Sequence, residues 1–520
     1  MRKRYVLPAP VVCLLGSLFL GGCHSTPKAV SEQPRLAATA PASALPPSSW
    51  IVPVDVTPST NPPQSSWTTL AWQEFVALNW PSAVPADSSG VSGLPNSQLS
   101  IGASSSNGAM IPTVWLTYRS VANTMLPGAQ DPGPWQSNPV AFPAGCQAMA
   151  PPYQVSTGYQ PMLLDLISKF SSPVVGSDVD EASGPPLIEQ SGWFVTFDIR
   201  VDQSEYAYIQ QNGYYNAQTQ TSAETANGQL LPFPRTGAGM PSLANFGALE
   251  VKAAWRILNP ATDQAIIPRY YTQAGYFLQQ DGKTCQGPAL FGLIGLHILR
   301  LTPTTPSTWF WATFEQVDNV VPPSQGVSAT LAAANTPNGN CPPPTATIVS
   351  PYNVPPSTTQ YPPNKNIPWT GTAAPVVNVC QVTNVGSAVQ SANQTWQNNL
   401  QGTVWANYQL IDTINPSVQG GPTYPIAITN TNVNTNILAN TTMETYLQGN
   451  GPGNGQSCMD CHAFATPQGA PKTNPSANQI FTFVLSNAGM PPSATAAARK
   501  TAQRLPKKVL DILGSMRKRH

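Results

Sequence analysis

The chain has 520 residues, among them 57 prolines, 38 glycines and 13 tryptophans, and only 9% of its residues are charged. This composition is too apolar for a disordered chain, and the proline content excludes a helical bundle or a coiled coil, because proline costs about 3 kcal/mol inside a helix. The net charge of +1 argues against nucleic acid as a partner.

The N-terminal residues have the pattern of an export signal. Basic residues at positions 2–4 precede the apolar stretch Val11–Leu20, which has signal-peptide length and is short for a transmembrane helix. The stretch ends in Leu20-Gly21-Gly22-Cys23, which resembles a bacterial lipobox, so we expect residues 1–22 to be a lipoprotein signal peptide and an acylated Cys23 to hold the protein on a lipid bilayer, at the periplasmic face of the cell envelope. His24 stands where inner-membrane retention signals place Asp, which favours the outer membrane. An ordinary signal peptide with an incidental cysteine is the alternative, and it also predicts export.

A tether and a β-rich body follow the signal. Residues 23–64 are rich in Pro, Ala, Ser and Thr, which predicts a flexible tether. In the body, residues 65–385, helices are expected over Ser66–Trp80 and Met162–Phe170, and residues 325–385, rich in Pro, Thr and Asn, predict a long surface excursion. The β-branched and aromatic runs predict five strands, which are Thr113–Tyr118, Gly192–Val201, Leu249–Leu258, Leu290–Leu301 and Trp309–Val317.

Residues 386–490 form the next predicted segment. Helices are expected over Ala392–Leu400 and Ile437–Leu447, and strands over Thr403–Ile414 and Ile480–Leu485. This stretch is short for an independent core, so we expect it to pack on the body.

The segment at 386–490 contains a sequence motif with a known chemical role. Ser457-Cys458-Met459-Asp460-Cys461-His462 includes Cys-x-x-Cys-His, the attachment pattern of c-type haem. Two cysteines three apart on a helical turn can form thioethers to the two vinyl groups of one haem, and the following histidine then turns its imidazole to the iron. A thioredoxin-like pair would follow a strand and needs no histidine, and a zinc site would need a second pair of ligands from a chain with only four histidines. The sequence therefore predicts one covalent haem c on Cys458 and Cys461, with His462 as the proximal iron ligand. The segments 403–410 and 438–446 are expected to supply walls around the macrocycle.

Two residues are candidates for the distal side of the iron. Met490 stands in Gly489-Met490-Pro491-Pro492, which is similar to the axial-ligand loop of small bacterial cytochromes c, and a thioether ligand would make a six-coordinate electron carrier. His297 lies in a predicted buried strand, with Arg300 on the other face by alternation. It is either a satisfied core histidine, a sixth ligand, or a distal acid-base group for peroxide.

The remaining cysteines fit an oxidising compartment. Of the eight cysteines, four belong to the signal, the lipid site or the haem motif, and four remain. An even number predicts two disulfides. The sequence favours Cys341–Cys380 and Cys146–Cys285 among the three pairings, and free buried thiols are the alternative.

Charged residues form two groups of interest. Glu250, Lys252 and Arg256 share one face of a predicted strand, and a solvated outer face is the expected reading. Residues 491–520 form a basic tail, in which eight Lys or Arg accompany the single acid Asp511, and four apolar residues between 509 and 516 share a helical face. The tail is either a basic amphipathic helix for anionic lipid or an acidic partner, or a frayed solvated end.

Five stretches carry a resemblance to a known family: residues 72–80 (WQEFVALNW), 250–256 (EVKAAWR), 295–298 (GLHI), 311–319 (WATFEQVDN) and 457–462 (SCMDCH). They resemble a family of largely uncharacterised bacterial cytochrome c proteins, over most of residues 66–486. The resemblance implies haem c and no defined substrate. The C-terminal haem motif is also similar to the cytochrome c-prime-beta group, whose β-rich fold implies an open distal side and argues against ligation by Met490.

These observations predict an α+β fold: a β-rich body with peripheral helices and a C-terminal haem c segment packed on it. The expected function is single-electron transfer by a membrane-anchored periplasmic c-type cytochrome, with a redox partner protein that the sequence does not identify. One alternative is a haem-dependent oxidoreductase, peroxidase-like, or a gas binder with an open distal site. Another is a scaffold that binds a partner or polymer and carries a redox haem.

Overall fold

The computed structural model describes those parts of the chain that build one folded unit, which spans residues 41–520. The described residues are 45–46, 48–86, 90–137, 146, 153–164, 187, 195–227, 233–234, 247–278, 285–304, 309–319, 385–415, 438–444, 462, 465–468 and 482–492.

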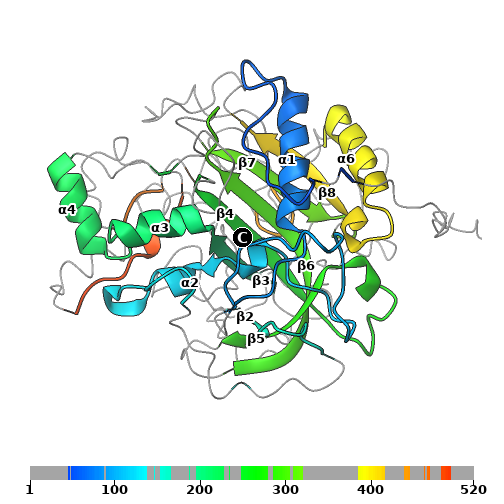
Figure 1. Cartoon of the computed structure of the whole chain (residues 1–520), viewed down its shortest axis with the longest axis horizontal. Coiled ribbons are helices and arrows are strands. Elements are labelled where there is room, and N and C mark those ends of the chain that lie inside the picture. Colours follow the sequence, from blue (N-terminus) through cyan, green and yellow to red (C-terminus); the bar gives the residue numbers. More distant parts are fainter. Residues whose placement is uncertain are drawn as a thin grey trace, which may run out of the picture. The chain divides into compact units, whose positions relative to one another are not determined.

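The described residues form a mixed eight-stranded sheet (Figure 1). Its strands run in the order β1-β3-β4-β6-β5-β2, and β7 and β8 continue from β6. All strand pairs are antiparallel except β2 with β5, which is parallel. The strands are β1 (Arg119–Ser120), β2 (Met162–Leu164), β3 (Thr196–Val201), β4 (Leu249–Leu258), β5 (Thr272–Leu278), β6 (Cys285–Arg300), β7 (Phe310–Gln316) and β8 (Tyr408–Ile414).

Five α-helices accompany the sheet in the described part of the chain (Figure 1). They are α1 (Gln64–Leu78), α2 (Val121–Thr124), α3 (Gln203–Gln211), α4 (Ala217–Asn227) and α6 (Ser387–Asn399). Short 3-10 turns occupy η1 (Trp115–Thr117), η2 (Pro127–Ala129), η3 (Ile267–Arg269), η4 (Val404–Asn407) and η6 (Val484–Asn487). Helices and a mixed sheet together confirm the predicted α+β class.

Aromatic packing fixes α1 and α6 on one face of the sheet. Trp72 of α1 stacks on Trp396 of α6 with ring centroids 5.9 Å apart, and it meets Phe314 of β7 edge-on at 5.1 Å. Phe75 stacks on Phe314 at 4.3 Å. Such ring pairs each contribute about 0.5–1.5 kcal/mol beyond the apolar area they bury, so the two helices lie side by side over β7 and β8 (Figure 1).

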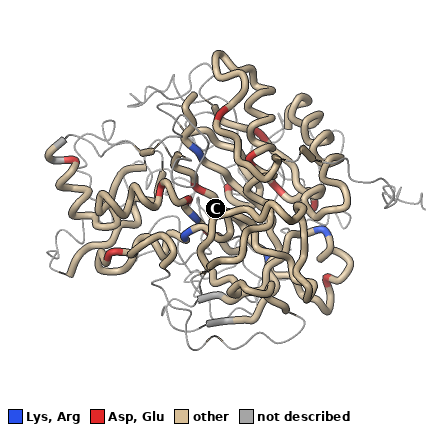
Figure 2. Tube along the Cα trace, in the orientation of Figure 1, with Lys and Arg blue, Asp and Glu red and all other residues tan. Residues whose placement is uncertain are grey.

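A buried ion pair joins α1 to the same face of β6. Arg300 donates from Nη1 to Glu74 Oε1 at 2.7 Å, and both side chains are fully buried. Arg300 also donates to the carbonyls of Pro53 and Val54. Charges are sparse along the described trace (Figure 2), and this pair is one of the few charged contacts that lie wholly inside the core.

Most of the long predicted elements are confirmed. The predicted helix at 66–80 is α1, the predicted helix at 392–400 is α6, and β4 has the bounds that the sequence predicts. The predictions at 192–201, 290–301 and 309–317 correspond to β3, β6 and β7. Of the strand predicted over 403–414, the second part is β8 and the first part is the turn η4.

Four predictions of secondary structure are wrong. The predicted strand Thr113–Tyr118 is mainly the turn η1, and the predicted helix at 162–170 begins as strand β2. Residues 438–444 form a bridge and a turn where a helix was predicted, and residues 484–487 form η6 where a strand was predicted. The helices α3 and α4 and the strand β5 were not predicted from the sequence.

Several predictions lie outside the described residues. They concern Cys23 with the signal and most of the tether, the excursion at 325–385 up to residue 384, and the basic tail beyond residue 492. Of the four disulfide candidates, only Cys146 belongs to the residues whose side chains are described, so the pairing stays a prediction. Among the described helices, none has the length and hydropathy needed to cross a bilayer.

Candidate functional site

Strand alternation gathers polar side chains on the sheet face opposite α1. Side chains two apart in a strand share a face, so Glu250 and Lys252 of β4 lie with His297 and Leu299 of β6. The register pairs Lys252 with His297 and Glu250 with Leu299, and the next strand places Trp311 opposite Leu299. Arg300, by the same alternation, lies on the α1 face, as the sequence predicts.

The expectation that Glu250, Lys252 and Arg256 form a solvated face is wrong. Their side chains keep exposed fractions of only 5%, 8% and 5%. A bulge between Ala254 and Trp255 shifts the strand register before Arg256, whose guanidinium lies over the ring of Tyr270 at 5.6 Å. Lys252 Nζ lies 4.9 Å from the centre of the Phe197 ring, and Glu250 interacts with Glu205, and alternation alone does not reveal these contacts.

The segment at residues 438–444 covers this face through a glycine. A side chain at Gly295 of β6 would place its Cβ only 2.3 Å from Thr442 Oγ1, so the segment lies directly against the bare backbone. Asn440 donates from Nδ2 to Thr313 Oγ1 at 3.0 Å, and Thr441 donates from N and Oγ1 to the Glu315 carboxylate at 2.6 and 2.8 Å. These contacts hold the segment in a turn and position Glu444 next to strand β6.

Glu444 meets His297 in the resulting site. Glu444 Oε2 lies 3.3 Å from His297 Nε2, and it also accepts a hydrogen bond from the Asn440 backbone N–H at 2.9 Å. His297 is 5% exposed and Glu444 is 7% exposed. The pair is an ion pair whenever the imidazole is protonated.

His462, the predicted iron ligand, lies at the same site. Its imidazole meets Trp311 edge-on with ring centroids 4.4 Å apart, and Phe483 edge-on at 5.0 Å. The side chain is 8% exposed. Two aromatic rings, of Trp311 on β7 and of Phe483, therefore pack against this buried histidine.

A cavity separates these groups, and we call it the His462 cavity. It has a volume of about 30 Å³ and is partly open to solvent. It is lined by Ile199, Glu250, Lys252, His297, Leu299, Trp311, Glu444, His462, Phe483, Val484 and Asn487. The cavity thus brings together two histidines that are 165 positions apart in the sequence.

Buried acids continue from this cavity towards α3. Burial, and then the neighbouring Glu250 and Asp202, raise the pKa of Glu205. Burial also raises the pKa of Asp202 to about 7, although this carboxylate caps α3 by accepting from the backbone N–H of Glu205 at 2.9 Å. Two carboxyl groups that interact in a buried position cannot both ionise cheaply, and this repulsion favours the protonated form of Glu205.

The other predicted ligand, Met490, lies elsewhere. It is half-buried and does not line the His462 cavity. Its neighbour Gly489 donates to the Tyr215 carbonyl and accepts from the Ala217 N–H, both at 2.9 Å, and a Cβ on Gly489 would meet the backbone N of Ala129 at 2.5 Å. These contacts fix the methionine loop at the start of α4.

The structure describes most of the two segments predicted as haem walls, but not the two cysteines predicted to attach the haem. Cys458 and Cys461 lie outside the described residues. The segment at 438–446 contributes Glu444 to the cavity, whereas Trp405 of the segment at 403–410 packs against Phe75 of α1 at 5.6 Å. Within the described residues, no group of three or more His, Cys, Asp or Glu side chains is arranged to hold a metal ion.

Glu444, Trp311 and Phe483 are the site residues that sequence reasoning did not single out. Glu444 and Phe483 lie on segments that reach the cavity through tertiary contacts, and Trp311 lies on strand β7. No local spacing in the sequence indicates that any of the three lines a cavity. Comparison of the chain with models of protein families, with curated proteins and with solved structures finds no match.

Proposed function

We propose that the chain is a membrane-anchored c-type cytochrome that transfers single electrons, with one haem bonded to Cys458 and Cys461 and with His462 as the proximal ligand. Bound haem supplies a one-electron iron couple, whose potential the protein sets through ligation, burial and hydrogen bonding. The lipid anchor at Cys23 and the periplasmic location belong to this proposal.

The observation that carries the proposal is the position of His462. The last residue of the Cys-x-x-Cys-His motif is buried against Trp311 and Phe483, at the edge of a cavity. A proximal histidine needs such a fixed ring beside open space, and aromatic walls lower the local dielectric around a redox centre. A histidine of a chance motif would instead be expected at the surface of its loop.

Two histidine side chains line the cavity, which supports a haem with a nitrogen ligand on each side. His297 Nε2 is buried and has no hydrogen-bond partner among the described residues, although it lies 3.3 Å from the Glu444 carboxylate. Hydrogen bonding or charge pairing by a carboxylate raises the basicity of a ligating imidazole. We therefore favour His297 over Met490 as the group on the distal side.

A second candidate function rests on the same pair. An imidazole beside a buried carboxylate is an arrangement that general acid-base catalysis uses. If the iron keeps an open distal position, His297 with Glu444 is placed to act as a general acid-base pair, and the chain would be a haem oxidoreductase or a gas binder.

Visible and EPR spectra of the purified protein separate these functions. We expect a covalent haem that survives a denaturing gel, low-spin ferric iron, and a change of the spectrum in His297→Ala but not in Met490→Ala. High-spin iron in the unmodified protein would favour the oxidoreductase or gas binder. A preparation without haem from cells competent for cytochrome maturation would refute both.

A further inference from the structure

A buried glutamine of α4 joins two segments that meet at His462. Gln220 is fully buried, and its side-chain amide makes three hydrogen bonds to backbone atoms. Its Oε1 accepts from the Gln468 N–H at 2.8 Å, and its Nε2 donates to the Leu485 carbonyl at 3.0 Å and to the Tyr214 carbonyl. Two of these partners lie 248 and 265 positions further along the chain, so the amide links α4 to two separate parts of the C-terminal segment.

The three partners fix the orientation of this amide. A glutamine side chain offers two N–H donors and one carbonyl acceptor. In the opposite orientation, the NH2 group would face the Gln468 N–H, and the oxygen would face two carbonyl oxygens. Both contacts would be repulsive, so only one orientation satisfies the site. An apolar side chain here would leave the N–H and both carbonyls without this partner, and buried polar groups without a partner are costly.

The first bonded segment carries His462 itself. The Ala465 N–H donates to the His462 carbonyl at 3.0 Å, so residues 462–465 form one turn that precedes Gln468. The side chain of Ala465 is fully buried. The amide of Gln220 therefore holds the chain six residues after the imidazole, and a buried turn connects that contact to the imidazole.

The second bonded segment packs against the His462 ring. Leu485 belongs to η6, and Phe483, two residues before it, meets the imidazole edge-on with ring centroids 5.0 Å apart. Val484 and Asn487 of the same segment line the His462 cavity. One amide thus holds both the segment that carries the imidazole and the segment whose aromatic ring packs against it.

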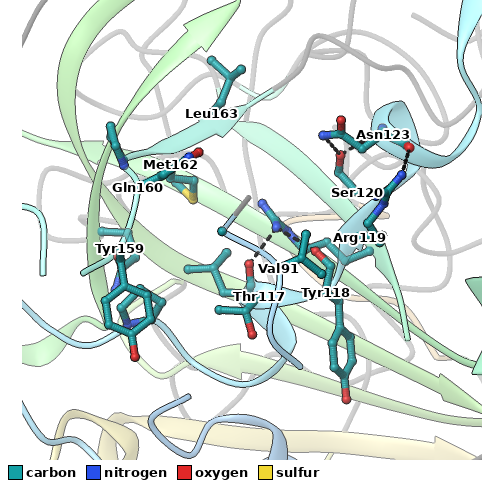
Figure 3. A pocket seen from close by; sticks show the side chains of 16 residues that line it. Val91, Thr117, Tyr118, Arg119, Ser120, Asn123, Tyr159, Gln160, Met162 and Leu163 are labelled. Carbon is teal, nitrogen blue, oxygen red and sulfur yellow. Dashed lines mark hydrogen bonds between the residues drawn. The ribbon is translucent and has the colours of Figure 1, made fainter. Parts of the chain in front are cut away.

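The far end of the second segment has a support of its own. Gly489 is hydrogen-bonded to the start of α4 through both its N–H and its carbonyl, and a Cβ on it would meet the Leu126 carbonyl oxygen at 2.6 Å. Arg119 holds that neighbouring stretch, because its Nη2 donates to the Asn123 carbonyl at 2.5 Å, and Figure 3 shows these two residues beside each other. Loss of the glutamine amide is therefore expected to loosen the two bonded segments and to leave this anchor in place.

We propose that Gln220 is the residue that positions His462, because its amide holds the segment that carries the imidazole against the segment that carries Phe483. In its consequence for the iron, this inference rests on the proposed function, in which His462 is the proximal ligand. Groups that orient a ligating imidazole tune the metal that it binds. Gln220 does not line the His462 cavity, so it acts on the imidazole only through the two segments.

Hydrogen exchange of the full chain, read by mass spectrometry, tests these contacts without any need for haem. Gln220→Met nearly keeps the length of the side chain and removes its hydrogen bonds, and Gln220→Asn keeps the amide but is one methylene shorter. Gln218→Met is the control, because Gln218 is an exposed residue of the same helix. In peptides that contain residues 462–468 or 484–488, we expect exchange to become faster by about tenfold or more in Gln220→Met, by a smaller factor in Gln220→Asn, and not in the control. The peptide of α1 is expected to keep its protection, which shows that the variants fold.

EPR of the haem-loaded protein tests the effect on His462. We expect the g values of the ferric signal to shift in Gln220→Met and to stay unchanged in Gln218→Met, with haem still attached in both variants. Equal exchange in the two variants, or g values that move in neither of them, would overturn the positioning role. If the purified chain carries no haem, the proposed function fails, and the exchange measurement still decides whether Gln220 holds the two segments together.

Discussion

Substitution of Gly295 by alanine tests the contact that builds the His462 cavity. The added Cβ would lie 2.3 Å from Thr442 Oγ1 and 3.2 Å from both Asn440 Oδ1 and Met443 Cε. Real Cβ contacts are essentially never shorter than 3.0 Å, so Thr442 must withdraw or rotate. Rotation would break its hydrogen bond to Asn440 Oδ1, which is 2.7 Å long. Overpacking of a close-packed core costs about 1–3 kcal/mol, and we expect Gly295→Ala to lower the free energy of unfolding by that amount.

Urea unfolding followed by tryptophan fluorescence measures the effect. Gly386→Ala is the matched control, because nothing lies within 4 Å of the added Cβ and its backbone φ of −60° suits any residue. The control is expected to change the free energy of unfolding by less than about 1 kcal/mol, because the entropy that alanine removes from the unfolded chain is opposed by the loss of glycine at the N-cap of α6. If Gly295→Ala is as stable as the control, the segment at 438–444 does not lie against β6 in the way described, and the position of Glu444 beside His297 loses its support.

Three further substitutions test other parts of the structure. Glu74→Ala leaves the Arg300 charge buried without its partner, so chemical denaturation is expected to show a free energy of unfolding lower by about 3–5 kcal/mol. The double variant Glu74→Leu/Arg300→Met is expected to lose less. Equal stability of Glu74→Ala and the unmodified protein would contradict the buried pair. Burial and then the nearby carboxylate of Glu444 raise the pKa of Glu315 to about 7 against two hydrogen bonds from Thr441. The folded state therefore holds a proton that the unfolded state releases, stability falls as the pH rises from about 4.5 to about 7, and Glu315→Gln flattens that slope in a pH series of unfolding curves. Trp311→Ala removes a wall of His462 and is expected to cost about 3–5 kcal/mol, with faster hydrogen exchange in the peptide that contains His462; unchanged exchange would argue against the contact.

The strands at the centre of the sheet were predictable because local pattern and tertiary environment agree there. β4 is a mostly apolar run with charges at Glu250, Lys252 and Arg256, and it ends just before Asn259-Pro260. Residues 113–118 have the same composition and form a 3-10 turn instead. The Thr113 N–H donates to Tyr271 Oη at 3.0 Å, so a side chain far away in the sequence takes a hydrogen bond that a strand neighbour would have used. The N–H groups of Leu116 and Thr117 instead donate to the carbonyls three residues before them, both at 3.1 Å.

The site was predictable only in its chemistry. His462 and His297 stand out in the sequence because the chain has four histidines, and the spacing of the motif gives the first a role. Their meeting in one cavity depends on the turn at 438–444, which local propensity presents as a helix and which the Glu315 carboxylate holds as a turn. The burial of Glu250 and Lys252 depends on contacts with Glu205 and Phe197, which are also distant in the sequence. A periodic pattern indicates which residues share a face, and long-range packing decides which face is covered.

Intact mass of the protein, purified from cells competent for cytochrome maturation, tests the haem proposal most directly. The account predicts a mass above that of the polypeptide by one haem, retained after denaturation, and absent from a variant with both Cys458→Ala and Cys461→Ala. A polypeptide mass without this increment, or an increment that persists in the double variant, would contradict it.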